Sequence, residues 1–544
     1  MDPSAVRSAL NEMAYLHVPD KDRSKSPSPA DSLASSATDI STLPIHGRHG
    51  SDGEHEPLTG RKTLQGSRYR DSHKGLTKNL AFAIGAAALG SAFQHGYNIG
   101  VVNAPQKLVV AFINDTYYHR FETAASTETT TMIYSIIVSI YCIGGMIGGL
   151  MTAFAAEKFG RKGGLLFNNV FVIVAAALMG FARSCRSYEM MIMGRFFIGV
   201  NNGLNAGLGP MYLNEISPTH LRGAVGSMYQ LVVTISILVS NILGLEGLYG
   251  TEKSWPLLFG FTIVPTILML CTFPLCPESP KYILINQGKD VAAQQALTWL
   301  RGSLEVHDEM DEMRAEYEQV KMVPKVTLYE MIHNIGLRTP LIIAMMVMLS
   351  QQLSGINAAF YFSTDIFTGA GLSRDAAANA TLAVSVINVL MTFVSLVLVE
   401  RAGRRQLLLI GLGGMAVLTV VLTISLSMNG SNPIFSWMSV ASVIGFVIMF
   451  AAGPGSIPWF LVGELFGQGA RPLATSLSVA VNWTANFLVG MCFLPLKAAL
   501  GHFVFLIFTA FLMFFWIFTF RRVPETKGKS VEEIAALFRQ RAYQ

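Results

Sequence analysis

The sequence predicts an all-α membrane protein, in which twelve transmembrane helices form two six-helix bundles with a cytosolic helical segment between the halves. Three observations support this fold class. Of the 544 residues, 51% are hydrophobic and only 14% are charged, which is far less charge than a soluble domain carries. Apolar runs of about 20 residues recur, and each is long enough to cross a bilayer. Short motifs of the first half also return in the second half, in the same order.

The predicted spans divide the chain into two bundles and three other segments. Residues 76–276 hold spans that start near Asn79, Met132, Gly164, Glu189, Ala224 and Trp255. Residues 338–522 hold spans that start near Leu341, Ala377, Gln406, Phe435, Arg471 and Gly501. Residues 277–337 include the charged, periodic run DEMDEMRAEYEQ, which predicts short amphipathic helices. Residues 523–544 are expected to form a cytosolic C-terminal tail.

The first 75 residues differ from the rest in composition. The stretch KDRSKSPSPADSLASSATDIS is rich in serine, proline and charge and has no periodicity, which predicts a disordered tail. No apolar run stands near the N-terminus, so we expect no cleaved signal peptide. Ser26 and Ser28 each precede a proline and are candidate phosphorylation sites, although a solvated linker is the simpler interpretation.

Loop charges predict the orientation of the chain in the membrane. Basic clusters follow the second span, at Lys158, Arg161 and Lys162, and the eighth span, at 401–405. Cytosolic loops carry an excess of Lys and Arg, so we expect these loops and both termini in the cytosol. Asn114 begins the glycosylation sequon NDT in a loop of the opposite parity. We therefore expect a glycan on Asn114 at the outer face of the plasma membrane.

Three motif pairs indicate that a six-span unit is duplicated. EKFGRK at 157–162 returns as ERAGRR at 400–405, EISPTHLR at 215–222 as ELFGQGAR at 464–471, and PESPK at 277–281 as PETKG at 524–528. Each motif lies at the predicted cytosolic end of a span, and both halves have the same parity. Parallel repeats of this kind are related by an axis along the membrane normal, with a substrate site between them near mid-depth.

The repeated motifs also carry paired charges. Glu215 and Glu464 each precede an arginine by seven residues, and Glu157 and Glu400 each stand beside a Gly-Arg turn. These charges either anchor the topology or form ion pairs that open and close. The duplication favours the second interpretation, a latch that holds the two halves together at the cytosolic side.

Neutral polar groups replace charges at mid-depth. The amides expected there are Gln230, Gln351, Gln352, Asn357, Asn388 and Asn486, and the aromatics near them are Phe360, Tyr361, Phe362, Trp459 and Trp483. Amides donate and accept hydrogen bonds as hydroxyls do, so this lining suits a neutral polyol. The alternative is that the amides join helices, at about 0.6 kcal/mol each. Helix breaks at Gly355 and at 453–458 favour a binding site.

Several function classes lack the residues that they need. The five cysteines have no metal-ligand spacing, and GKS at 528–530 lacks the upstream glycine of a phosphate-binding loop. No catalytic constellation is visible, and the net charge of +5 is too small to suggest nucleic acid as a partner. We expect no enzyme activity, no metal and no cofactor; the lipid bilayer and a small solute are the expected partners.

The chain closely resembles the facilitative glucose transporters of animals, in the sugar-porter branch of the major facilitator superfamily. The resemblance covers Lys78 to Phe538 and rests on GYNIGVVNAPQK, FGRK, GRFFIGV, PMYLNEISPTHLRGA, PESPKYILIN, SQQLSGINAAFYFSTDIF, VERAGRR, GPGSIPWFLVGELFGQGARP, NWTANFLVGMCF and VPETKG. The motif QLS at 352–354, in the predicted seventh span, resembles the motif of the glucose-preferring subgroup of this family. The resemblance implies the major facilitator fold and passive, uniport transport of a hexose by alternating access. Glucose is the first candidate, and fructose and galactose are further ones.

The resemblance also implies roles for individual residues. The implied sugar site comprises Gln230, Gln351, Gln352, Asn357, Asn388, Trp459 and Asn486. Tyr361 and Phe362 match the outer lid of the family. The implied inner charge network comprises Arg161, Arg195, Glu215, Arg222, Glu400, Arg404, Arg405, Glu464 and Arg471. On this basis Gln351→Leu is expected to weaken sugar binding and to leave folding intact.

Three positions depart from the family pattern. Ala451 stands where relatives carry a glutamate that faces the sugar, Ser456 replaces a proline, and His95 replaces an aromatic residue. The first departure makes some fructose transport plausible. Two alternatives to uniport stay open, a proton-coupled sugar symporter and a sugar sensor with a transporter fold. Symporters of this type carry an acid at the position of Asn98, and an amide there cannot titrate. The sequence does not give the oligomeric state.

Overall fold

The computed structural model describes residues 75–542 of the chain. The predicted N-terminal tail, with Ser26 and Ser28, lies outside these residues except for Gly75. Within them nearly all structure is helical. Nine helical segments of the described residues are apolar and long enough to span a membrane, and one of these, residues 471–522, contains two complete spans. The helices α3 and α7, which are less apolar, complete the predicted set of twelve, so the expected fold class is confirmed.

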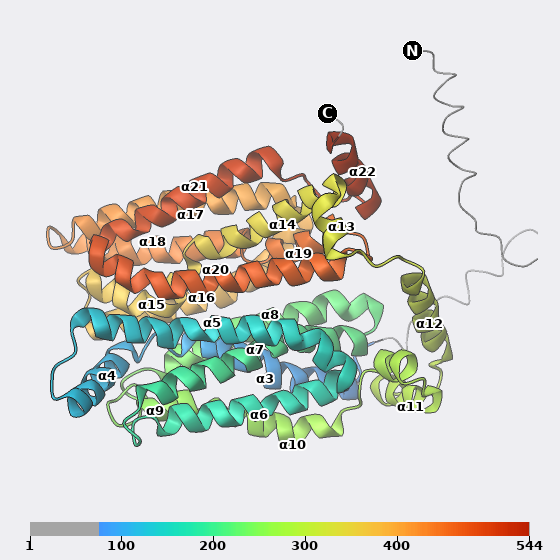
Figure 1. Ribbon diagram of the computed structural model, residues 1–544, viewed down its shortest axis with the longest axis horizontal. Helices are drawn as coiled ribbons and strands as arrows, with labels where there is room; N and C mark the ends of the chain where they lie inside the picture. Colours follow the sequence, from blue (N-terminus) through green and yellow to red (C-terminus); the bar gives the residue numbers. More distant parts are fainter. Residues whose placement is uncertain (1–74, 543–544) are drawn as a thin grey trace, which may run out of the picture. The chain divides into compact units, whose positions relative to one another are not determined.

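The helices fall into two groups, one for each half of the sequence (Figure 1). The first bundle comprises α3 (Lys78–Gly100), α5 (Thr127–Lys158), α6 (Gly160–Phe181), α7 (Tyr188–Ile216), α8 (Arg222–Leu243) and the broken span α9 (Trp255–Gly260) with α10 (Ile263–Thr272). The second comprises α14 (Ile335–Leu353) with α15 (Ile356–Gly369), α16 (Arg374–Arg401), α17 (Arg404–Ser427), α18 (Pro433–Ala452) with α19 (Ile457–Leu465), α20 (Arg471–Leu500) and α21 (Val504–Arg522).

Polar side chains explain why α3 and α7 are less apolar than the other spans. Gln94 on α3 donates to Thr266 Oγ1 at 2.8 Å and accepts from Asn205 of α7 at 3.1 Å. Asn205 also accepts from Asn168 on α6, at 2.9 Å. All four side chains are buried. Because these side chains form hydrogen bonds with one another inside the first bundle, two low-hydropathy helices can stand at membrane depth.

Two spans of the second bundle break where the sequence predicts it. Between α14 and α15 the chain turns at Gly355, whose φ of 91° lies in the left-handed region. A side chain there would also clash with Phe508, so only glycine fits. Between α18 and α19 the break runs through Gly453 and Pro454. These breaks leave carbonyl groups without helical partners, and such groups must find other donors within the membrane.

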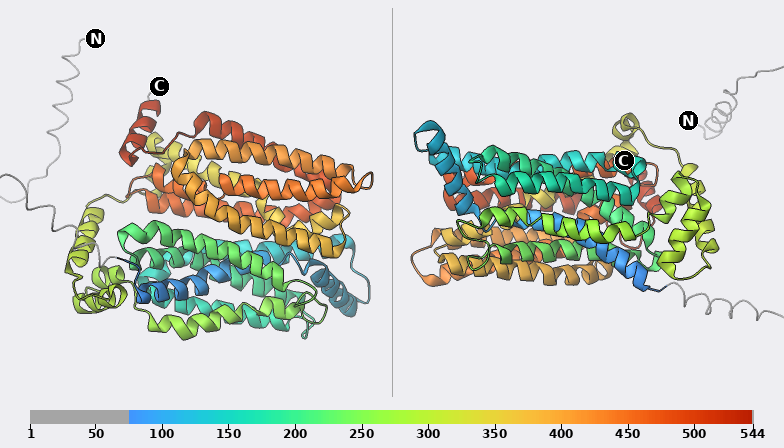
Figure 2. Two further views of the ribbon diagram at one scale, coloured as in Figure 1. Left: turned by 180° about the vertical axis from the view of Figure 1, so that it is seen from behind. Right: turned by 90° about the horizontal axis from the view of Figure 1, so that it is seen from below.

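Short helices lie at the two ends of the bundles. The helix α4 (Gln106–Phe121) projects at one end, which we call the α4 end (Figure 1). The π-helix η5 (Tyr282–Asn286) and the helices α11 (Asp290–Arg301), α12 (His307–Lys321) and α13 (Leu328–His333) occupy the opposite end, which we call the α11 end (Figures 1 and 2). The last helix, α22 (Val531–Ala542), packs Ile534 and Phe538 against the second bundle at this end.

The two bundles contact each other mainly through α5 with α20 and through α8 with α16. Glycines of α5 let neighbouring helices lie close to it on two sides. A side chain at Gly144 or Gly148 would clash with backbone atoms of α7, so these residues let α5 and α7 pack closely within the first bundle. Gly145 instead faces the Trp483 ring of α20 across the two bundles.

Candidate functional site

The bundles are joined at the α4 end and not at the α11 end. One hydrophobic cluster at the α4 end includes Tyr97 and Tyr134 of the first bundle and Tyr361, Phe362 and Phe367 of the second. Toward the α11 end, each bundle has a hydrophobic cluster of its own. A continuous apolar contact therefore seals one end of the interface and not the other.

Polar contacts between the bundles show the same asymmetry. Within residues 75–542, the cross-bundle bonds between nitrogen and oxygen atoms are Asn103 Nδ2 to Ser363 Oγ at 2.6 Å, Thr364 N to Asn103 Oδ1 at 3.2 Å, Asn241 Nδ2 to Ser385 Oγ at 2.9 Å, Thr392 Oγ1 to Thr234 Oγ1 at 3.3 Å, and the Arg374–Glu246 ion pair at 2.6 Å. Two weaker bonds to methionine sulfur join α5 and α20, Ser139 Oγ to Met491 Sδ at 3.5 Å and Thr484 Oγ1 to Met146 Sδ at 3.7 Å. Across residues 75–542, no side-chain hydrogen bond or ion pair joins the bundles at the α11 end. The structure is thus closed at the α4 end.

Gln230 marks the point where the interface between α8 and α16 opens. Gln230, Thr234 and Asn241 share one face of α8, because they are spaced by four and seven residues. Thr234 and Asn241 are buried against α16, whereas Gln230, one turn closer to the α11 end, is exposed. A polar side chain on the face toward the second bundle is therefore accessible from the α11 end.

Asn388 of α16 lies between the two residues that bind α8, Ser385 and Thr392. The Asn388 side chain is 6% exposed. Its amide forms no hydrogen bond with any described residue, yet neither amide atom is fully buried. The group therefore keeps its full capacity to donate and accept, in the interface between the bundles.

The side-chain amide of Asn486, on α20, has a hydrogen-bond partner for only one of its two polar atoms. Its Oδ1 accepts from the hydroxyl of Tyr361 at 3.3 Å, and its Nδ2 is without a partner among the described residues and is not fully buried. Trp459, at the start of α19, is 46% exposed. Both residues thus retain polar groups that a solute can reach.

The amides of the broken span are more occupied than the sequence suggests. Gln351 donates to the carbonyls of Pro454 and Gly455, at 3.0 and 2.7 Å, and accepts from Asn482 at 2.8 Å. It therefore satisfies the carbonyls that the α18–α19 break frees, and its hydrogen bonds are fully used. Gln352 donates to Asn482 Oδ1 at 3.0 Å and accepts from Asn357. These contacts argue against the expectation that Gln351→Leu leaves folding intact, because the substitution removes the donors of both carbonyls.

Sequence reasoning missed Asn482. It attracts attention in the sequence only as a sequon inside a span, but it joins Gln351 and Gln352 and is 4% exposed. A signal was present, since Asn482 stands four residues before Asn486 and therefore on the same face of α20.

The lid residues lie in the sealed end. Tyr361 and Phe362 of α15 are fully buried, and Phe362 stacks on Phe493 of α20 with 5.2 Å between ring centroids. Phe362 departs from helical geometry, with φ −133° and ψ 16°, so α15 is kinked at this residue. A kink at this position gives the lid a natural point at which to bend.

The repeated charges form the same structure twice. Arg161 of α6 binds Glu215 of α7 through two hydrogen bonds of 2.8 and 2.9 Å. Arg404 of α17 binds Glu464 of α19 at 2.9 and 3.0 Å. Each pair lies within one bundle in this conformation, whose α11 end is open. Here the pairs hold the ends of adjacent helices together. The expected latch between the two halves stays a prediction for the conformation that is closed at this end.

The remaining predicted network residues pair mostly with the backbone. Arg222 donates to Ser217 O at 3.4 Å, Arg471 to Phe466 O at 3.2 Å, and Arg405 to Phe520 O at 2.6 Å. Glu400 is exposed, and it forms no ion pair within the part of the chain that the structure describes. Sequence spacing alone cannot tell these roles apart.

Arg195 does not belong to the network at the α11 end. It lies in the second turn of α7, toward the α4 end, and is fully buried. Its guanidinium donates to the carbonyls of Asn98, at 2.9 Å, and Ile137, at 3.3 Å, and lies 4.6 Å from the Tyr141 ring centroid. The assignment to the inner network is therefore wrong, because about 30 Å of α7 separates Arg195 from the α11 end.

The three departures from the family pattern lie at the interface or at the break. His95 of α3 is 3.4 Å from the Tyr229 hydroxyl, and its ring stacks near Trp483 of the second bundle, with 6.4 Å between centroids. Ala451 is half-buried near the end of α18. The Ser456 hydroxyl is buried without a hydrogen-bond partner among the residues described.

Three further sequence expectations concern the glycan acceptor, metal ligands and the cysteines. Asn114 is exposed on α4. Within residues 75–542 no group of three or more His, Cys, Asp or Glu side chains is arranged to hold a metal ion. The cysteines in this part of the chain are unpaired thiols.

Comparison with known proteins bears on this arrangement. The sequence profile described as "Sugar (and other) transporter" matches residues 83–538. The chain is 45% identical over 470 residues to "Solute carrier family 2, facilitated glucose transporter member 1" of Gallus gallus, which covers 86% of this chain and 95% of that protein. It is 46% identical over 466 residues to facilitated glucose transporter member 3 of Ovis aries, covering 85% and 93%.

A solved structure shares the fold. The structure titled "Inward open conformation of the xylose transporter XylE from E. coli" superposes with a TM-score of 0.70 at 23% identity, over 84% of this chain and 99% of that chain. At this identity the likeness concerns the arrangement of helices and not the solute.

Proposed function

Since the chain belongs to the sugar (and other) transporter family, we propose that it carries a hexose passively across the plasma membrane by alternating access. D-glucose is the first candidate, because the relatives of 45–46% identity are named facilitated glucose transporters. The absence of a glutamate at Ala451 makes fructose a second hexose to test, and galactose a third.

The observation that carries the proposal is a set of unpaired amides between the bundles. Gln230 and Asn388 make no hydrogen bonds within residues 75–542, and Asn486 and Asn357 each keep one polar atom free. An amide left unpaired at membrane depth is costly unless a solute or water completes it. These groups, with Trp459, form the proposed hexose site; Gln351 and Gln352 position it rather than bind the sugar with free groups.

The closed α4 end defines the conformational cycle that we propose. Sugar reaches the amides when the bonds of Asn103 and Asn241 across the bundles break and the lid at Tyr361 moves. The bundles then rock and expose the site at the α11 end. Because the Arg161–Glu215 and Arg404–Glu464 pairs lie within single bundles, they keep each half rigid during this motion.

The proposal includes an orientation and a division of the chain. The α4 end, with Asn114 as glycan acceptor, faces outward, and the α11 end with both termini faces the cytosol. We retain residues 76–276 and 338–522 as the two bundles and 277–337 as the cytosolic helical segment. Two details qualify the boundaries: α14 begins at Ile335, and the tail 523–544 contains α22.

Radiolabelled D-glucose uptake into proteoliposomes tests the function. Passive transport predicts equilibration without a pH gradient, and competition by unlabelled hexoses ranks the substrates. Accumulation only under an inward proton gradient would identify a symporter instead. Binding of D-glucose without any flux would identify a sensor. An Asn388→Leu variant serves as the site control, because it should lose affinity for the sugar without losing the fold.

A further inference from the structure

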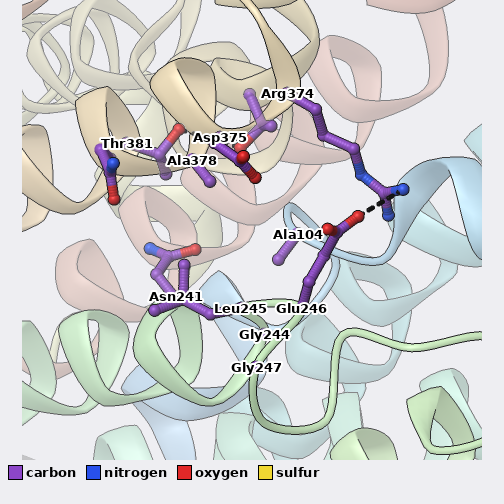
Figure 3. Close-up of a pocket in the computed structure, with 12 residues that line it drawn as sticks. Ala104, Asn241, Gly244, Leu245, Glu246, Gly247, Arg374, Asp375, Ala378 and Thr381 are labelled. Atoms are coloured by element: carbon purple, nitrogen blue, oxygen red, sulfur yellow. Dashed lines mark hydrogen bonds and ion pairs between the residues drawn. The ribbon is translucent and has the colours of Figure 1, made fainter.

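A second polar space lies between the bundles at the α4 end, far along α8 and α16 from Gln230. The pocket has a volume of about 230 Å³. Figure 3 shows it between the end of α8 with its following loop, on one side, and the start of α16 on the other. Because each bundle supplies one wall, the pocket exists only while the bundles are closed at this end.

An ion pair bridges the two walls. Arg374 of α16 and Glu246 of the loop after α8 are 2.6 Å apart (Figure 3). Asp375, Asn379 and Thr381 line the same wall as Arg374. With two carboxylates against one guanidinium, the lining has more acceptors than donors and a small excess of negative charge.

The side chain of Asn241 shows that something should donate a hydrogen bond here. Asn241 is 4% exposed, lines the pocket, and its Oδ1 is buried without any partner among the described residues. Figure 3 shows this oxygen on the side of the amide toward Glu246. An unpaired buried acceptor costs about 1–3 kcal/mol, a cost that a hydroxyl donor at this end of the pocket would offset.

The orientation of that amide is fixed by its other neighbour. Ser385 Oγ donates to the carbonyl of Thr381 at 3.0 Å, which uses the only hydrogen of the hydroxyl. Ser385 Oγ must therefore accept from Asn241 Nδ2, 2.9 Å away. A flipped amide would place two acceptors against each other, so Oδ1 is the atom left without a donor among the described residues.

We propose that this pocket binds a second hexose, at the outer mouth of the closed conformation and separate from the amides at Gln230 and Asn388. Asn241 Oδ1 and the Asp375 carboxylate have no donor among the described residues, and a hexose supplies hydroxyl donors. It also carries no charge that the Arg374–Glu246 pair would repel. The pocket is smaller than the range of about 300–1,000 Å³ typical of drug-sized ligands, which suits one small polar solute. The inference rests on the proposed hexose transport.

A consequence follows from the two-sided lining. A molecule that contacts both walls binds only the conformation in which the α4 end is closed, and so it shifts the equilibrium toward that conformation. Hexose in the outer pocket is therefore expected to slow the return of the carrier to the outside. High external hexose then inhibits net uptake.

Equilibrium binding of radiolabelled D-glucose to the purified full-length protein tests the proposal, with uptake into proteoliposomes as the parallel readout. The wild type should bind two equivalents of D-glucose per protein, and its uptake should fall at high external D-glucose. Ala378→Phe fills the pocket from the α16 wall and should lose the second equivalent and the inhibition, while uptake at low D-glucose persists. Ala378→Ser is the matched control and should keep both.

Several outcomes overturn the proposal. A single equivalent in the wild type excludes a second site, and a second equivalent that survives Ala378→Phe places it elsewhere. If Ala378→Phe fails to fold, Asn241→Ala replaces it, because this variant removes the unpaired acceptor without adding bulk. Asn241→Ala should also lose the second bound D-glucose, and a variant that still binds two D-glucose molecules would refute the proposal. A wild type that transports no hexose refutes the proposed function itself, whereas transport with one equivalent refutes only the outer pocket.

Discussion

Asn103→Leu is expected to open the α4 end. Asn103 bonds two residues of the opposite bundle, Ser363 at 2.6 Å and the backbone N of Thr364 at 3.2 Å. Water can replace both bonds when the bundles separate, but nothing replaces them in the closed state of the variant. At about 1 kcal/mol net for each hydrogen bond, the closed conformation loses about 2 kcal/mol. That corresponds to a shift of about 30-fold in the ratio of closed to open molecules.

Distances between spin labels measure this shift. Labels on Thr123→Cys and Ser431→Cys, in a cysteine-free background, report on loops at the α4 end of each bundle; both positions are exposed. The variant should populate a longer distance that the parent lacks. Asn429→Leu is the matched control, because Asn429 donates only to Gly369 within its own bundle, at 3.0 Å. An unchanged distribution for Asn103→Leu, or an equal change in the control, would refute the reasoning.

Further predictions concern the site and the charge pairs. Asn388→Leu should raise the D-glucose concentration for half-maximal uptake about tenfold, since one net hydrogen bond of about 1 kcal/mol or somewhat more is lost, with an unchanged melting temperature. Gln351→Leu should instead lower the melting temperature, because it leaves two backbone carbonyls unpaired at about 1–3 kcal/mol each. Glu464→Gln should destabilise the second bundle in a thermal unfolding assay, whereas Glu400→Gln, which breaks no ion pair within the described residues, should not. Ala451→Glu should lower the D-glucose concentration for half-maximal uptake about tenfold, because a carboxylate accepts stronger hydrogen bonds from hydroxyls.

Each of these predictions can fail in a distinct way. Equal melting temperatures for Gln351→Leu and the wild type would show that the carbonyls at the α18–α19 break find other donors. Normal affinity in Asn388→Leu would remove this residue from the site. Equal effects of Glu464→Gln and Glu400→Gln would mean that the Arg404–Glu464 pair contributes no more than an exposed charge.

The sequence was sufficient for the features that repeat along the chain. Span length and the motif pairs predict the fold class and the two halves, and the glycine at 355 predicts a break at its observed place. The depth of Arg195 was also within reach, because span parity places the start of α7 at the α4 end. Its motif alone gives no depth, and that is where the prediction went wrong.

Other features depend on which helices approach each other, and sequence spacing does not contain this information. Glu215 pairs with Arg161 of the neighbouring helix and not with the arginine seven residues later. Gln351 is a plausible sugar ligand by type, but the carbonyls of the α18–α19 break occupy its amide. The closed α4 end is a property of one conformation, and the pattern of residues is the same in every conformation.

The most direct test of passive carriage through a site between the bundles is counterflow. Proteoliposomes preloaded with unlabelled D-glucose are diluted into a trace of labelled D-glucose, with a protonophore present. Our account predicts a transient accumulation of label above its external concentration, because a carrier whose site faces one side at a time exchanges sugar for sugar. A monotonic approach to equilibrium, or no flux at all, would contradict it.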